Sequence, residues 1–253
     1  MNEDPLADTG LPRGYDLQIR DLKNRAVRMG ELALGMVHDG WRAYDHADLA
    51  GAQTVLDRAP QLDTEDEDME HAAIAFLVLR QPTAVDLRTA VAVLKMTTHL
   101  DRIGRLGFDM ARITSSPPAK ELADLRNLLQ RMDDIVESMV RQSLDALDHD
   151  QVDVARKLFR RDDVIDRMHR EANQIIITNL EKDPALAKRL ATDLLVARHF
   201  ERIADNACKV AEKTIYAITG QRRSEYLPRH PVSPYALEPP FREATLRKQA
   251  ESG

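Results

Sequence analysis

Acidic side chains spaced four residues apart are the groups of this sequence best suited to chemistry. Glu201 and Asp205 form one such pair, and Asp66 and Glu70 form a second. Residues four apart in a helix lie on the same face, so each pair presents two carboxylates together. Carboxylate oxygens bind hard and borderline divalent cations. The same spacing also fits a face that is simply exposed to solvent, so the pattern alone leaves both interpretations open.

A third group copies the layout of Glu201 and Asp205 but contains an arginine. Asp101, Arg105 and Asp109 follow one another at intervals of four. Like charges four apart in a helix cost about 0.2–0.5 kcal/mol, so acidic pairs beside apolar residues suggest a cation, a basic partner or mere tolerance. Here Arg105 can instead neutralise one of its acidic neighbours through an ion pair.

Motifs of catalytic and nucleotide-binding sites are missing from the sequence. It contains no Walker A loop, no G-x-G-x-x-G and no G-x-S-x-G. The single cysteine, Cys208, excludes an intrachain disulfide and a multi-cysteine metal site, and we expect a buried, inert thiol. Asp68-x-x-His71 is a weak match to a di-iron motif, and His99 and His199 are expected to be structural. We therefore expect no catalytic residues and no enzyme activity.

Composition favours long helices. The 253 residues are 43% hydrophobic and only 4% aromatic, with 10 glycines, which argues against a sandwich, a barrel or a Rossmann sheet. The net charge of −6 excludes a globally basic nucleic-acid binder. Residues 1–14 lack the apolar centre of a signal peptide, and no run of 18 apolar residues exists. We expect a cytoplasmic protein that reaches the inner face of the membrane only through its partners.

Prolines mark the ends of the predicted helices, because helices rarely continue through proline. The apolar residues between the prolines recur every three or four positions, as in an amphipathic helix. The second segment contains Pro60, where it is kinked or broken. We predict helices at 15–44, 47–80, 83–114, 119–148, 151–181 and 184–219.

The chain contains an internal repeat. Residues 43–63 and 146–166 share Ala, Asp, His and Arg positions at an offset of 103, and HLDRI at 99–103 becomes HFERI at 199–203. The change of offset to 100 indicates that the loop at Pro82 is longer than the loop at Pro184. The predicted fold is all-α, with two tandem three-helix bundles of long antiparallel helices. The predicted division is a disordered N-terminus at 1–14, repeats at 15–116 and 117–220, and a Pro-rich, disordered tail at 221–253.

Two segments carry a resemblance to a known family. RQPTAVDLR at 80–88 and FERIADNA at 200–207, together with the repeated Ala-x-x-x-Asp, resemble the PhoU family of phosphate-transport regulators. The resemblance covers residues 15–220. It implies two three-helix bundles side by side and a homodimer.

The resemblance also implies a function. Members are cytoplasmic, non-catalytic negative regulators of the phosphate-starvation response and of phosphate uptake. They act as adaptors between the ATPase subunit of a high-affinity phosphate ABC transporter and a sensor histidine kinase. The resemblance implies neither nucleic-acid binding nor a transmembrane segment. The alternative is a carboxylate-rich, metal-binding helical protein with a storage or enzymatic role.

Some members carry multinuclear metal clusters on paired acidic motifs, although no cofactor is required. Carried onto this sequence, the resemblance implies iron, zinc or another divalent ion on Glu201, Asp205, Asp66, Glu70, Asp101 and Asp109. Three departures weaken the match: Arg105 replaces an acid, Lys209 replaces the usual asparagine, and His169 and Asn173 replace an acidic pair.

Overall fold

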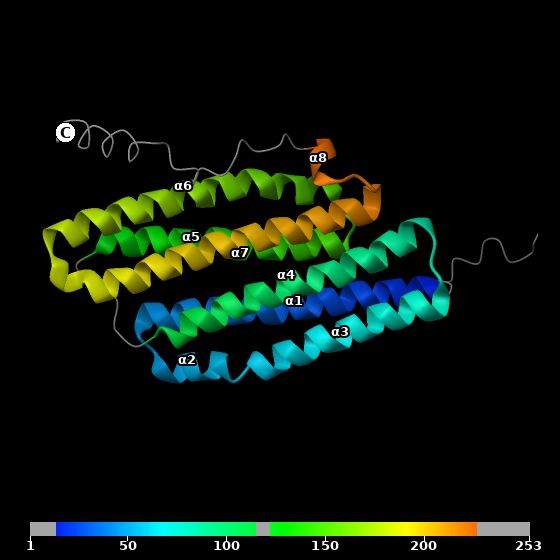
Figure 1. The fold of residues 1–253 in the computed structure, drawn as a ribbon, viewed down its shortest axis with the longest axis horizontal. Helices are drawn as coiled ribbons and strands as arrows, with labels where there is room; N and C mark the ends of the chain where they lie inside the picture. The colour runs from blue at the N-terminus through cyan, green and yellow to red at the C-terminus, as the bar shows by residue number, and fades with distance from the viewer. Residues whose placement is uncertain (1–13, 115–121, 227–253) are drawn as a thin grey trace, which may run out of the picture. The chain divides into compact units, whose positions relative to one another are not determined.

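The computed structural model describes residues 14–114 and 122–226, and every regular element in them is helical (Figure 1). This confirms the predicted all-α class. The elements are α1 (Gly14–His46), α2 (Leu49–Leu56), α3 (Ala59–Arg80), α4 (Ala84–Arg112), α5 (Ala123–Asp148), α6 (Val152–Lys182), the 3₁₀ turn η1 (Pro184–Leu186), α7 (Ala187–Thr219) and α8 (Arg223–Tyr226).

The predicted second helix is broken into α2 and α3. Asp48 caps α2 with its side chain, which accepts hydrogen bonds from two backbone N–H groups. Pro60 lies in the first turn of α3, where a missing N–H costs nothing because it would have had no helical partner. The break therefore falls immediately before the proline.

Residues up to Gly220 form one compact unit, and residues 221–253 form another. The second unit contributes the short helix α8 to the described residues. The segments predicted to be disordered at 1–14 and 221–253 lie outside the described residues over 1–13 and 227–253.

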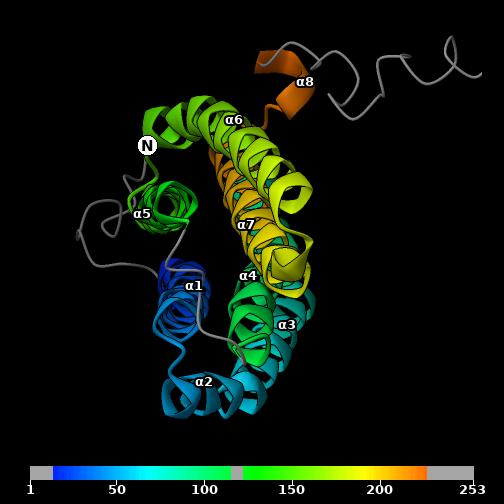
Figure 2. The same ribbon diagram turned by 90° about the vertical axis from the view of Figure 1, so that its left-hand side faces the viewer.

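Four long helices of the larger unit enclose its core. Figure 2 shows α1 and α5 on one side and α4 and α7 on the other, with α3 beside α4 and α6 beside α7. The core face of α7 follows the apolar period of its sequence, because Val196, Phe200 and Ile203 are fully buried. Trp41 of α1 packs edge-on against Phe200, with ring centroids 5.3 Å apart.

The helices α1 and α4 approach closely because two glycines face each other. A Cβ atom on Gly107 would lie 2.5 Å from the backbone of Met36 and Val37, and one on Gly40 would lie 2.3 Å from the carbonyl oxygen of Gly107. Only glycine allows this contact between the two backbones.

The internal repeat is visible in the backbone. Ala47 after α1 and Asp150 after α5 both have a positive φ, 54° and 55°. In each repeat a backbone hydrogen bond of 2.9 Å closes the helix end: Asp48 N–H to Ala43 O, and Gln151 N–H to Ala146 O. Three residues, 81–83, separate α3 from α4, and four residues, 183–186, separate α6 from α7, with three of these four in η1. The prediction that the loop at Pro82 is the longer one is therefore wrong.

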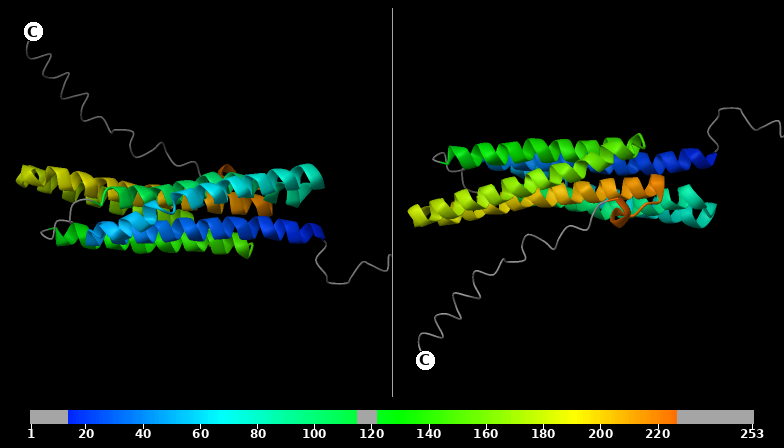
Figure 3. Two further views of the ribbon diagram at one scale, coloured as in Figure 1. Left: turned by 90° about the horizontal axis from the view of Figure 1, so that it is seen from below. Right: turned by 90° about the horizontal axis from the view of Figure 1, so that it is seen from above.

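The first helices of the two repeats, α1 and α5, lie side by side and antiparallel (Figure 3). Near the C-terminal end of α1, Trp41 Nε1 donates a hydrogen bond of 3.2 Å to Gln130 Oε1 of α5. Towards the N-terminal end of α1, Lys23 Nζ lies 2.6 Å from Asp150 Oδ1, just beyond the end of α5. These contacts join residues about a hundred positions apart in sequence, and they fix the register of α1 against α5.

Candidate functional site

Of the acids predicted on α3 and α4, Asp66, Glu70 and Asp101 lie near enough for their charges to interact, whereas Asp109 lines a cleft between α4 and α7. Burial raises the pKa of the Asp66 carboxyl, and the nearby charges of Asp101 and Glu70 raise it further. Arg105 already supplies a positive charge, because its guanidinium forms ion pairs with Asp101, at 3.2 Å, and with Asp63. The carboxylates of this group therefore repel one another, and Arg105 partly neutralises their charge.

Glu201 is not on a solvated face, so that interpretation is wrong for this residue. It is only 7% exposed, and burial raises its pKa to about 7, against the lowering effect of Arg198. One carboxylate oxygen lies 2.7 Å from Arg198 Nη1, and the other has no hydrogen-bond partner within the described chain. The charges of Asp205 and Asp166 also raise this pKa. His169 of α6 is buried near the same charged groups.

Asp109 and Asp205 lie in one cleft of about 630 Å³ between α4 and α7. Positive side chains outnumber these two acids in the lining: Arg102, Arg105, Arg198, Arg202 and Lys209. This balance of charge favours an anionic ligand over a cation in the cleft. Asp109 is also paired with Arg112 at 3.1 Å.

An exposed apolar edge occupies the adjoining ends of α3 and α4. It holds five of the ten large apolar side chains exposed in the described residues: Ile74, Val78, Leu79, Val85 and Leu87. Val78 is 66% exposed and Leu79 is 77% exposed. Concentrated apolar exposure of this kind marks a surface for contact with a partner.

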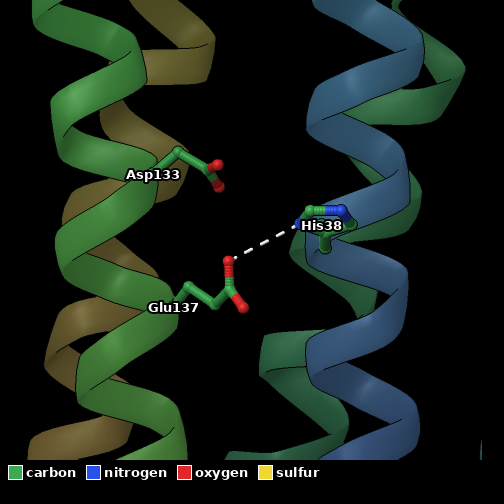
Figure 4. Close-up of side chains that lie close together, drawn as sticks. All are labelled: His38, Asp133 and Glu137. Carbon is green, nitrogen blue, oxygen red and sulfur yellow. Dashed lines mark ion pairs between the residues drawn. The ribbon is translucent and has the colours of Figure 1, made fainter.

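A further polar group lies between α1 and α5, where His38 faces two acids (Figure 4). It is the one set of three His, Cys, Asp or Glu side chains in residues 14–114 and 122–226 whose ligand atoms all lie within 4.8 Å of one another. The two acids are Asp133 and Glu137 of α5. Burial raises the pKa of Asp133 to about 7, and the charges of Glu137 and Asp134 add to this effect.

This group was not predicted from the sequence. Asp133 and Glu137 have the same four-residue spacing as the predicted pairs, but they belong to a segment that we interpreted by its apolar stripe alone. His38 is 95 positions away from Asp133, so only the antiparallel packing of α1 on α5 brings it close. The four-residue spacing of the two acids was the available sequence signal, whereas no sequence pattern indicated that His38 lies beside them.

Two of the simpler expectations hold. The thiol of Cys208 is buried, as predicted. The expected structural role of His99 is supported by its contact with Asn206 Oδ1, 3.1 Å from its Nδ1. Within the described helices, none is both long and apolar enough to cross a membrane.

Comparison with known proteins agrees with the repeated architecture. The sequence-family model described as the PhoU domain matches the chain twice, at residues 26–114 and 129–214. A phosphate-specific transport system accessory protein PhoU homolog of Clostridium acetobutylicum is 27% identical over 82% of this chain and 95% of its own length. A protein of the same description from Caulobacter vibrioides is 29% identical over 86% of this chain and 95% of its length.

A solved structure leads to the same assignment. The crystal structure of PhoU from Pseudomonas aeruginosa superimposes with a TM-score of 0.75 at 26% identity, covering 82% of this chain and all of the other. The family model matches more than half of the residues, one match in each repeat. The chain therefore belongs to the PhoU family.

Proposed function

We propose that this protein is a negative regulator of phosphate uptake and of the phosphate-starvation response. It acts in the cytoplasm, as a homodimer, between the ATPase subunit of a phosphate ABC transporter and a sensor histidine kinase. Both repeats match the family model, and relatives that match nearly end to end are described as accessory proteins of phosphate-specific transport systems. That extended match is the observation on which the proposal rests.

The apolar edge is the surface that we assign to the transporter ATPase. A regulator without its own chemistry must act through contact, and contact requires surface that gains free energy when it is covered. Leu79 and Val78 are the most exposed side chains of the edge. The positive charge of the cleft between α4 and α7 suits an acidic partner.

Regulation through this contact requires that the ATPase bind with different affinity in its two nucleotide states. A partner that binds both states equally shifts neither. The direct test is to measure binding of the full chain to the ATPase with ATP and without nucleotide. Different affinities support the proposal, whereas equal affinities contradict the coupling.

Two variants connect the contact to the edge. Leu79→Glu places a charge in the edge, and Ile177→Glu makes the same change at a side chain of α6 that is 51% exposed. We expect Leu79→Glu to weaken ATPase binding and Ile177→Glu to leave it unchanged. If both variants weaken ATPase binding equally, or if neither weakens it, the assignment of this contact to the apolar edge is contradicted.

We also propose that the acids of α3 and α4 hold a divalent cation. The raised pKa of Asp66, with Asp101 and Glu70 close by, is the repulsion that a cation relieves. Metal analysis of protein purified without chelator tests this, with Asp66→Asn expected to lower the content. The corresponding pair in the second repeat is Glu201 and Asp205, but the basic side chains that line the cleft at Asp205 favour an anion, so we propose no cation there.

A further inference from the structure

The group formed by His38, Asp133 and Glu137 extends from the surface into the interior of the protein. The side chain of His38 is 42% exposed and that of Glu137 is 31% exposed, whereas Asp133 is only 3% exposed. His38 Nδ1 lies 3.6 Å from Glu137 Oε2, which is too far for a hydrogen bond. Figure 4 shows both carboxylates directed from α5 towards the histidine of α1.

Asp133 is the anomaly of this group. Its Oδ1 is buried and has no hydrogen-bond partner among the described residues, and the same holds for His38 Nδ1. A buried polar atom without a partner is costly, and more so when the group is charged. Two residues with such atoms, whose ligand atoms lie within 4.8 Å of each other and of a second carboxylate, therefore indicate that a bound group satisfies them.

Glu137 is held in place for such a role. Its Oε1 accepts a hydrogen bond of 2.6 Å from Arg141 Nη2, one helical turn further along α5. This leaves Oε2 directed towards His38. An outer partner that fixes one oxygen of a carboxylate is a usual accompaniment of a metal ligand.

We propose that His38, Asp133 and Glu137 bind one zinc ion between α1 and α5. An imidazole nitrogen with two carboxylate oxygens is a ligand set that zinc accepts, and three protein ligands leave a fourth position for water. The exposed His38 provides the entrance, and the buried Asp133 forms the base of the site. The ion also joins the first helices of the two repeats.

The internal repeat does not reproduce this ligand set, so we expect one such site in each chain. At the offset of 103, the residues equivalent to Asp133 and Glu137 are Gly30 and Leu34, and the one equivalent to His38 is Arg141. Neither glycine nor leucine supplies a ligand, so the symmetric position is empty of ligands. This site is also separate from the acids of α3 and α4 and from those of α7.

Zinc titration of the full chain, stripped of metal, tests the proposal by calorimetry. We expect His38→Gln and Asp133→Asn each to remove one zinc equivalent, or to weaken it at least about tenfold. Asp66→Asn and Glu201→Gln are matched controls in the other acidic groups, and should leave that equivalent intact. Circular dichroism verifies that each variant is folded, and His38→Gln changes a side chain that is 42% exposed and lies outside the core.

Imidazole resonances in the nuclear magnetic resonance spectrum give a second, direct readout. Addition of zinc should shift one histidine ring resonance that is missing in His38→Gln, and the melting temperature should rise. The proposal is overturned if the variants bind zinc as the wild type does, or if no resonance of His38 moves. Loss of this equivalent only in Asp66→Asn or Glu201→Gln would likewise overturn it.

Discussion

At the scale of single residues, buried polar contacts between helices make this fold specific. Tyr44 of α1 donates a hydrogen bond of 2.6 Å to Asp193 Oδ1 of α7, and both groups are buried. Burial raises the pKa of Asp193, while the hydrogen bond from Tyr44 and the charge of Arg189 lower it. The hydroxyl of Tyr44 therefore stabilises the ionised form of a carboxylate that water does not reach.

Tyr44→Phe should reduce stability in a pH-dependent way. Without the hydroxyl, the pKa of Asp193 rises further above its unfolded value, so the folded state favours the protonated acid. The loss should therefore be small at pH 5 and grow as the pH rises, reaching about 1.5–3 kcal/mol at pH 8. Urea unfolding at both pH values measures it, with Tyr216→Phe as the control. A loss that is the same at both values would contradict this role.

The acids at the candidate sites could be found from sequence, but their partners could not. Four-residue spacing identified Asp66, Glu70 and Glu201, because spacing determines which face of a helix a residue occupies. The burial of Glu201 depends on packing against neighbouring helices. The pairing of Arg105 with Asp63 joins two helices, and the approach of His38 to Asp133 joins two repeats. Such contacts depend on helix rotation and register, which periodicity does not determine.

At the scale of elements, the distance between α1 and α4 is set by glycine. The facing backbones at Gly40 and Gly107 leave no space for a methyl group. The long helices themselves were predictable from proline positions and the apolar period. The break between α2 and α3 was predictable from Pro60, which favours the first turn of a helix.

Gly107→Ala should destabilise the protein by about 1–3 kcal/mol, because its methyl group would meet the backbone of Met36. Gly35→Ala is the matched control, since its Cβ would meet only Arg58 Nη1 at 3.7 Å. That change should be neutral or stabilising by about 0.5–1 kcal/mol, as alanine favours helix. Chemical unfolding compares the two. Similar effects from both variants would show that the close approach does not limit packing.

Ala47→Gly should stabilise the protein by about 1 kcal/mol, because Ala47 has a φ of 54°, a conformation that glycine adopts without strain. Thermal and urea unfolding both report this change. Asp150→Gly is the comparison in the second repeat, where the gain is offset by loss of the ion pair with Lys23. A destabilising Ala47→Gly would mean that the turn is held by other contacts.

At the scale of the whole molecule, the two three-helix repeats of the chain present different surfaces. The apolar edge belongs to α3 and α4, and the equivalent region of the second repeat is built differently, with η1 following a single linking residue. Within residues 14–114 and 122–226, the ligand set at His38 also occurs once. Repetition therefore supplies the scaffold, while departures from the repeat supply the candidate contact and metal sites.

The central claim is that this protein keeps the phosphate-starvation response off when phosphate is plentiful. The most direct measurement is a phosphate-starvation reporter in a strain that lacks the gene, grown in phosphate-rich medium. The account predicts a derepressed reporter, restored by the wild-type chain and by Ile177→Glu but not by Leu79→Glu. An unchanged reporter in a strain that also lacks any related gene would contradict it.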